Sequence, residues 1–307
     1  MKIFDTHCDT LLRLHSEKGK HFDQDTGLHI TYDHLKQAGS KVQCFALFIP
    51  NELPQEIKFK TALDMIDILH REILDKHPDI RLVQSKADID ALGEDEIGAM
   101  LTLEGCDAID IDLVKLRTLF RLGVRSIGMT WNNANAAADG AQESRAAGLS
   151  DFGRAVIREN NRHKVWTDVS HITEKGFWDV MEEAEFPIAS HSNARAICDH
   201  VRNLYDDQIK ALFERGGVMG MTFVPGFVNS TGEATIDDIL KHIDHICGLG
   251  GEKHIGFGSD FDGIGKTPEG LTNYGKYPLL IDALQKHYSE EQVKGFLFEN
   301  FYRALPC

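Results

Sequence analysis

The chain has 307 residues, of which 42% are hydrophobic and 26% are charged, which is enough to bury a large core. Length alone would suggest two domains, but α/β barrels of this size commonly form one. The 33 basic and 48 acidic residues give a formal net charge of −15. Such an acidic surface should repel phosphate backbones, so we do not expect nucleic acid as a partner.

The beginning of the chain and its cysteines bear on where the protein works. After Met1 and Lys2 comes a strand-like run that contains acidic residues, unlike the unbroken apolar segment of a secretory signal. No stretch approaches the ~18 uncharged apolar residues of a spanning helix, so we expect no membrane association. Scattered cysteines without CxxC spacing are typical of reduced core residues in a cytoplasmic protein. They are Cys8, Cys44, Cys106, Cys198, Cys247 and Cys307.

A short apolar run followed by a longer amphipathic stretch recurs along the chain. Several of the runs are apolar on both faces, as the strands of a parallel sheet covered by helices must be. The runs span residues 2–9, 42–50, 96–105, 124–132, 164–171, 186–192, 217–224 and 254–263. We expect each of them to form a strand.

Helical patterns separate these runs. Residues 56–76 place apolar side chains at helical spacing. Residues 235–251 begin with a Thr-x-x-Asp cap and end in a glycine-rich stop, and residues 206–217 end in glycines directly before a strand. The alternation predicts an α/β fold, and eight units predict a single (β/α)₈ TIM barrel over residues 1–307. A doubly wound sheet is the alternative, but its usual glycine fingerprint is replaced by Asp-Thr-His-Cys-Asp after the first strand.

Polar residues fall where the predicted strands end. Because the carboxyl ends of barrel strands converge on one face, we expect these side chains to share one mouth. They are His7, Asp9, Glu104, His171, His191 and Asp260. Imidazoles and carboxylates are zinc ligands, and one catalytic zinc uses fewer of them than this set offers. The sequence therefore predicts two metals bridged by a carboxylate, with Glu104 as the bridge.

Strand alternation refines the first cluster. Residues two apart share a face of a strand, so His7 and Asp9 are expected to point together into the mouth and Cys8 away from it. Asp5 is expected to be structural. Zinc is the default metal for these ligands, although cobalt or manganese would also fit.

Several motifs resemble the membrane dipeptidase (renal dipeptidase) family of zinc peptidases, in its bacterial branch. They are "DTHCD", "LTLEG", "DVSH", "ASHSNARAICDHVRNLYDDQI" and "IGFGSDFDG". The resemblance covers nearly the whole chain, and the family belongs to the amidohydrolase-type metal-dependent barrel hydrolases.

The resemblance implies a role for each matching residue. His7 and Asp9 would hold one zinc, His171 and His191 the other, and Glu104 would bridge them. Asp260 would handle protons, and Arg202 would bind the free carboxylate of the substrate, which suits its planar fork. The resemblance also implies a homodimer.

One position departs from the pattern of the mammalian members. They carry a histidine after T-x-T on the fourth strand, thought to help hold the scissile carbonyl, whereas this chain reads "GMTWNN" and places Trp131 there. Trp has no titratable group, but its indole N–H can donate a hydrogen bond. The amide of the adjacent Asn132 could donate a hydrogen bond to an oxyanion. We therefore assign Trp131 and Asn132 to substrate binding.

The expected activity is zinc-dependent hydrolysis of dipeptides by a hydroxide that bridges the metals, with Asp260 as general base and then acid. One alternative is another amidohydrolase activity at the same centre, on N-acyl amino acids or lactones or as a deaminase. Several of these activities would use a carbamylated lysine at a strand end to bridge the metals. This chain has Glu104 there instead, which disfavours them. A metal-binding barrel without catalysis is the second alternative, although burying so many unpaired polar groups would be costly in a scaffold.

Overall fold

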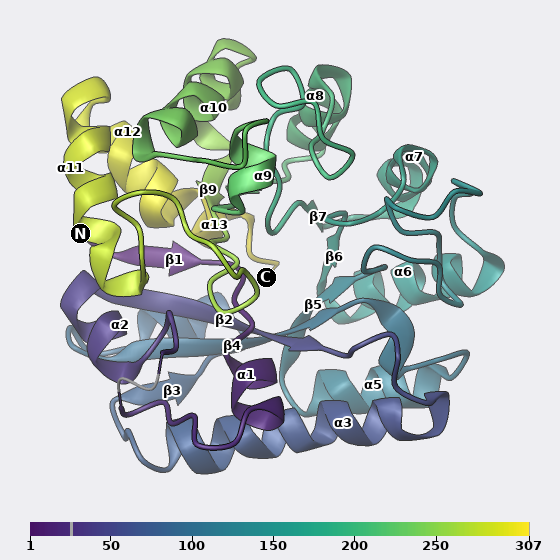
Figure 1. Ribbon diagram of the computed structural model, residues 1–307. Coiled ribbons are helices and arrows are strands. Elements are labelled where there is room, and N and C mark those ends of the chain that lie inside the picture. Colours follow the sequence, from purple (N-terminus) through teal and green to yellow (C-terminus); the bar gives the residue numbers. More distant parts are fainter. Residues whose placement is uncertain (25–26, 307) are drawn as a thin grey trace.

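Parallel strands joined by helices define the architecture in the computed structural model, which describes residues 1–24 and 27–306. The helices form an outer ring around the strands (Figure 1). The strands are β1 (Ile3–Asp5), β2 (Ser40–Phe48), β3 (Ile80–Leu82), β4 (Ile97–Glu104), β5 (Val124–Gly128), β6 (Trp166–Asp168), β7 (Pro187–Ile188), β8 (Met219–Met221) and β9 (Ile255–Phe257).

The hydrogen-bond order of the strands is that of a barrel. It runs β7-β6-β5-β4-β2-β1-β9-β8, with every pair parallel. A parallel bridge between Ala189 and Met219 joins the segment after β7 to β8 and brings the two ends of the sheet together. The predicted (β/α)₈ barrel is confirmed, and each of the eight predicted runs overlaps one barrel strand, although β2 begins before its run, at Ser40.

The short strand β3 was not predicted. It pairs with residues 97–99 of β4, whereas β5 pairs with residues 101–103 of that strand. The long strand β4 therefore leaves its first residues free for an extra partner outside the ring. Three residues with only Ile80 buried give no periodic signal in the sequence.

Helices follow most strands, and they include the three predicted ones. α3 continues as a π-helix over Leu69–Leu74, so the helical segment begins at Gln55 and ends at Leu74, just before the predicted end at 76. The helices are α1 (Thr10–Ser16), α2 (Tyr32–Ala38), α3 (Gln55–Ile68), α4 (Lys86–Asp90), α5 (Leu113–Arg121), α6 (Asp151–His163), α7 (Glu174–Glu183), α8 (Asp206–Glu214), α9 (Pro225–Val228), α10 (Ile236–Gly248), α11 (Tyr277–His287), α12 (Glu290–Lys294) and α13 (Asn300–Ala304).

The interior of the barrel is apolar at the end where the strands begin. Phe4, Val42, Met100 and Trp166 come from four strands and pack into one buried cluster. The indole N–H of Trp166 donates to the carbonyl of Ala304 at 3.0 Å, so α13 covers this end. Filling this end with large side chains leaves the opposite mouth for polar groups.

A polar layer lies above the apolar plug. The Thr6 hydroxyl donates to the Ser190 carbonyl at 2.7 Å, which ties the segment after β1 to the segment after β7. Gly220 and Gly258 make this contact possible, because a Cβ at either position would lie 2.1 or 1.9 Å from the Ser190 carbonyl oxygen. Only glycine fits so close to a backbone.

Two further predictions concern the cysteines, expected to be reduced core residues, and the absence of a membrane-spanning helix. The five cysteines in the described part of the chain are unpaired, and all but Cys247 are buried. Cys307 lies outside the described residues. Within the described ranges, no helix combines the length and apolarity needed to cross a membrane.

The N-terminal cap of α10 gives a stability prediction. Asp238 is buried and binds the Thr235 backbone N–H at 3.1 Å and Lys241 Nζ at 2.8 Å. Burial opposes the charged form, but these partners outweigh it and lower the pKa of Asp238 to about 2. The carboxylate therefore contributes stability that is present above its unfolded pKa of about 3.9 and lost as the pH falls toward 2.

We expect Asp238→Asn to lower the free energy of unfolding at neutral pH by about 1 kcal/mol. The difference from the wild type should shrink between pH 4 and pH 2, measured by urea denaturation. Asp237→Asn, an exposed change in the same turn, is the matched control and should cost less. A difference that stayed constant over this pH range would contradict the role of the charge.

Candidate metal centre

The six predicted ligand and proton-handling side chains meet at one end of the barrel. Glu104 is the last residue of β4, and His7 and Asp9 lie between β1 and α1. His171, His191 and Asp260 each stand three residues beyond the end of a strand, after β6, β7 and β9. The convergence expected of a barrel mouth is therefore present.

Glu104 occupies the centre of this group. One carboxylate oxygen, Oε2, lies 3.3 Å from His7 Nε2. The other, Oε1, lies 3.0 Å from His171 Nε2 and 3.9 Å from His191 Nε2. A carboxylate whose two oxygens face separate imidazole groups has the position that a bridging ligand requires.

A second group of ligand atoms adjoins the first. His7 Nε2 lies 3.5 Å from Asp9 Oδ2 and 3.9 Å from Asp260 Oδ1. Two sets of donor atoms can each surround an ion, His7 with Glu104 and His191, and His7 with Asp9 and Asp260. Asp260, which was predicted to handle protons, is therefore also close enough to be a metal ligand.

Two of the donor atoms lack a hydrogen-bond partner, which fits a metal. His7 Nε2 and Asp9 Oδ1 are buried without a hydrogen bond. Unpaired buried polar atoms are costly, and a cation would satisfy both of them. His171 Nε2 and His191 Nε2 contact each other at 2.7 Å, so these two donor atoms also lie close together. Imidazole nitrogens with carboxylate oxygens are the donors that zinc takes in proteins.

His7 and Asp9 point into the mouth together and Cys8 packs away from it, as predicted. β1 itself ends at Asp5, but a parallel bridge between Cys8 and Phe261 continues the pairing beyond it. Asp5 accepts hydrogen bonds from the backbone N–H groups of His7 and Ser259, at 3.2 and 3.0 Å, and from the Tyr277 hydroxyl at 2.8 Å. These bonds connect the segments after β1 and β9 and so place His7. Cys8 packs in the outer core, with its thiol 3.3 Å from the Cys44 carbonyl.

Two of these residues have a strained backbone. His171 has φ = 70° and Asp260 has φ = 62°, both in the left-handed region that non-glycine residues rarely adopt. Such conformations cost about 1–3 kcal/mol each and persist where surrounding structure imposes them. They aim the two side chains into the mouth instead of along the strand.

Burial and mutual charge set the protonation of the group. Burial, together with the Arg202 charge, lowers the pKa of His171 to about 3, which keeps the imidazole neutral. Burial opposes ionisation of Glu104, but His7 and His171 outweigh it, and the pKa of this carboxyl is lowered. The pKa of Asp260 is raised well above its usual value by burial and by the nearby charges of Asp9 and Glu104.

A small cavity of about 110 Å³ opens over these groups. Its polar walls are formed by the carboxylates and His171, and its apolar walls by Leu12, Phe48 and Trp131. The Trp131 ring packs against Phe48 with centroids 5.2 Å apart and lies 6.3 Å from His171. Trp131 thus faces the cavity.

Asn132 contacts a ligand residue. Its amide oxygen lies 2.8 Å from His171 Nδ1. A hydrogen bond from Nδ1–H to this oxygen leaves the lone pair on Nε2, the atom that faces Glu104. The oxyanion role assigned to Asn132 stays a prediction.

Arg202 is buried beside the histidines. Its Nη2 donates to the His191 carbonyl at 3.3 Å, while its Nε has no partner. Burial lowers the pKa of Arg202 to about 10, so the guanidinium is charged at neutral pH. A buried cation with an unused donor is suited to an anionic ligand.

Asp168 and Ser190 were not predicted to be functional. Asp168 ends β6 and binds the Ser190 hydroxyl, and the Ser190 Oγ lies 2.7 Å from His191 Nδ1. The sequence did contain a signal, because Asp168 lies three residues before His171 in "DVSH" and Ser190 lies directly before His191 in "ASHS".

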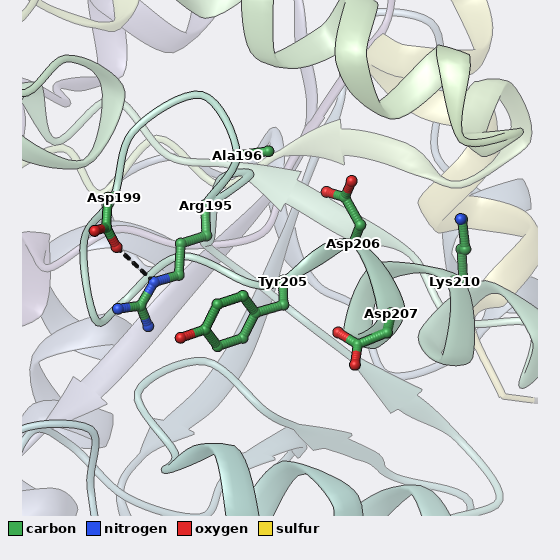
Figure 2. Close-up of a pocket in the computed structure, with 7 residues that line it drawn as sticks. All are labelled: Arg195, Ala196, Asp199, Tyr205, Asp206, Asp207 and Lys210. Carbon is green, nitrogen blue, oxygen red and sulfur yellow. Dashed lines mark hydrogen bonds and ion pairs between the residues drawn. The ribbon is translucent and has the colours of Figure 1, made fainter.

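A larger hollow of about 710 Å³ lies away from this chemistry (Figure 2). It is formed by the segment after β7 and the start of α8. Several of its charged side chains are already paired: Arg195 with Asp199 at 2.7 Å, and Asp206 with His245 at 2.8 Å. We therefore place the site in the smaller cavity, where donor atoms are unpaired.

Comparison with known proteins identifies the family of this chain. The family model described as membrane dipeptidase (peptidase family M19) matches residues 1–307. The chain belongs to the membrane dipeptidase family. The predicted family and the predicted enzyme class, a metallo-dipeptidase, are thereby confirmed.

Individual relatives are similar over most of their length. A protein of Schizosaccharomyces pombe described as an uncharacterized dipeptidase is 34% identical over 99% of this chain and 79% of its own. A crystal structure described as the metallopeptidase dipeptidase AC is 30% identical, covers 99% of this chain and 98% of its own, and has a TM-score of 0.93. A metallopeptidase of Rhodobacter sphaeroides, solved with a phosphinate mimic of the dipeptide L-Ala-D-Ala, is 28% identical with the same coverage and a TM-score of 0.94.

The central position of Glu104 gives a metal-binding prediction. We expect Glu104→Gln to weaken Zn²⁺ uptake by the metal-free protein at least ~10-fold, because a neutral amide cannot replace a carboxylate between two imidazole groups. The measurement is a competition titration against a chromophoric chelator. Glu94→Gln is the matched control, since Glu94 is exposed just before the other end of the same strand. Equal uptake by both variants would contradict the predicted role of Glu104.

Proposed function

We propose that this metallo-dipeptidase uses two zinc ions held by His7, Asp9, Glu104, His171 and His191, with Glu104 shared between them. The observation that carries this proposal is the position of Glu104, whose two oxygens face His7 on one side and His171 on the other. The unpaired Nε2 of His7 and Oδ1 of Asp9 support it. When bound, the metal pair lowers the pKa of a water molecule and polarises the peptide carbonyl.

In this proposal Asp260 transfers the protons. Its Oδ1 lies 3.9 Å from His7 Nε2 and its side chain lines the cavity, so it borders the place where the peptide bond must lie. The carboxylate accepts the proton that the attacking water loses and delivers it to the leaving amine. Its left-handed backbone turns the side chain toward this position.

Arg202 selects the substrate by its free carboxylate. The unpartnered Nε and the buried positive charge bind a free carboxylate more strongly than the neutral carbonyl of an internal peptide bond. Because Arg202 hydrogen-bonds the backbone of His191, the carboxylate is held at a short distance from the metal ligands. This spacing favours dipeptides over longer chains.

Leu12, Phe48 and Trp131 form the apolar wall of the small cavity, and we propose that they contact a substrate side chain. The relative with a bound mimic of L-Ala-D-Ala is in accord with small side chains in such a site. The homodimer and the cytoplasmic location stay predictions. N-acyl-amino-acid hydrolysis and lactone hydrolysis are less favoured.

The role of Asp260 can be separated from metal binding. We expect Asp260→Asn to lower kcat by about 10²–10⁴-fold, since the amide cannot accept the proton. Metal content by elemental analysis should stay at the wild-type value. A variant that lost metal in parallel with activity would show Asp260 to be a ligand instead.

The role of Arg202 can be tested with paired substrates. We expect Arg202→Gln to lower kcat/KM for a dipeptide by about 10–100-fold, because this is the loss expected when one charge-assisted hydrogen bond is removed. The same variant should match the wild type on the dipeptide amide, which has no carboxylate. Arg195→Gln, at a partly buried arginine outside the proposed site, is the control. Equal losses on both substrates would contradict carboxylate recognition.

A further inference from the structure

A chain of buried hydrogen bonds leads away from His191. His191 Nδ1 lies 2.7 Å from Ser190 Oγ, and the same Oγ contacts Asp168 Oδ2. All three residues are less than 10% exposed. The chemistry above uses only Nε2 of His191, so the other side of the imidazole is unexplained.

The orientation of Asp168 is fixed by the backbone. Its Oδ1 accepts the N–H of Ser170 at 3.0 Å and the N–H of Ser190 at 2.9 Å. Oδ2 therefore faces the Ser190 hydroxyl. Because a carboxylate has no proton to give, the single hydroxyl proton of Ser190 must point to Asp168.

The direction of this bond determines the tautomer of His191. A serine oxygen whose proton is committed can only accept from the imidazole, so Nδ1 carries the proton and Nε2 keeps its lone pair. Ser170 Oγ is farther from Ser190 Oγ, at 3.4 Å, and accepts from the His191 backbone N–H at 3.0 Å. The much shorter contact with the Asp168 carboxylate therefore takes the hydroxyl proton in preference to Ser170.

We propose that Asp168 and Ser190 are positioning residues that hold His191 in the Nδ1–H tautomer required for metal binding through Nε2. This inference rests on the proposed metal site, of which His191 is a ligand. Partners of this kind orient metal-binding histidines, and their loss typically costs roughly 10–100-fold in metal affinity.

The geometry predicts a distinctive effect of Asp168→Asn. The two backbone N–H groups require an oxygen at the Oδ1 position, so the amide NH₂ must face Ser190. Ser190 then accepts from the amide and turns its own proton toward His191. The imidazole is driven to the Nε2–H tautomer, in which the metal-binding nitrogen is blocked.

The test uses metal-free protein and Zn²⁺ titrated against a chromophoric chelator. We expect Ser190→Ala to weaken zinc binding about 10-fold and Asp168→Asn about 100-fold, the two ends of the range for such partners. The double variant should bind more tightly than Asp168→Asn alone, because without the serine hydroxyl nothing forces the wrong tautomer. A merely structural role would make the double variant worse.

Two further measurements keep the outcome decisive. Long-range ¹H–¹⁵N spectra of histidine-labelled metal-free protein should report Nδ1–H for His191 in the wild type and Nε2–H in Asp168→Asn. Thr167→Val is the matched control. Thr167 lies next to Asp168 on β6, and the change removes a buried 2.9 Å hydrogen bond that its hydroxyl accepts from Asn160 on α6. It should lower stability and leave zinc affinity unchanged.

The possible failures are distinguishable. If His191→Ala abolished one equivalent of zinc while Asp168→Asn bound like the wild type, the metal site would stand and the relay would be wrong. If His191→Ala bound zinc like the wild type, the metal site itself would be wrong, whatever tautomer the spectra reported. Failure of the double variant to recover affinity would also overturn the relay.

Discussion

The structure depends on one electrostatic constraint, the burial of Glu104 among three imidazoles at the mouth of the barrel. A carboxylate in this position is costly unless its oxygens have cationic or donor partners. His7 and His171 lie on opposite oxygens at 3.3 and 3.0 Å. His7 Nε2 makes no hydrogen bond despite its approach to Glu104, and Asp9 Oδ1 makes none either, so side chains alone do not satisfy the group.

The rest of the barrel can be understood as support for this cluster. The apolar plug around Phe4 and Trp166 closes the opposite end, so polar groups are confined to one face. Between plug and mouth, Thr6, Asp168 and Ser190 form a layer that fixes segments after the strands. Glycines at 220 and 258 admit the Thr6 contact. Each ligand therefore stands on backbone that is itself hydrogen-bonded, as pre-organised sites require.

The two histidines beyond β6 and β7 are held in different ways. Asn132, on the segment that also carries Trp131, contacts Nδ1 of His171. His191 is held from inside the barrel by Ser190 and, through it, by Asp168. One ligand is thus linked to the wall of the substrate cavity and the other to the rigid interior. Trp131 belongs to the cavity wall, so a change at this position would leave the interior support of His191 in place.

The sequence by itself determined the barrel, the family and the identity of the predicted ligands. Alternating apolar runs and capped helices have a period that can be read directly, and polar residues at strand ends must share one mouth in a barrel.

The tertiary structure decided the direction in which these side chains point. β1 ends at Asp5, and beyond it the bonds that Asp5 accepts and the bond from the Asp9 backbone N–H to the Phe261 carbonyl hold this segment against the one after β9. The left-handed backbone at His171 and Asp260, the extra strand β3 and the link from Asp168 to His191 all depend on contacts between distant segments. Local periodicity carries no information about such contacts, because they arise only when the strands close into a ring.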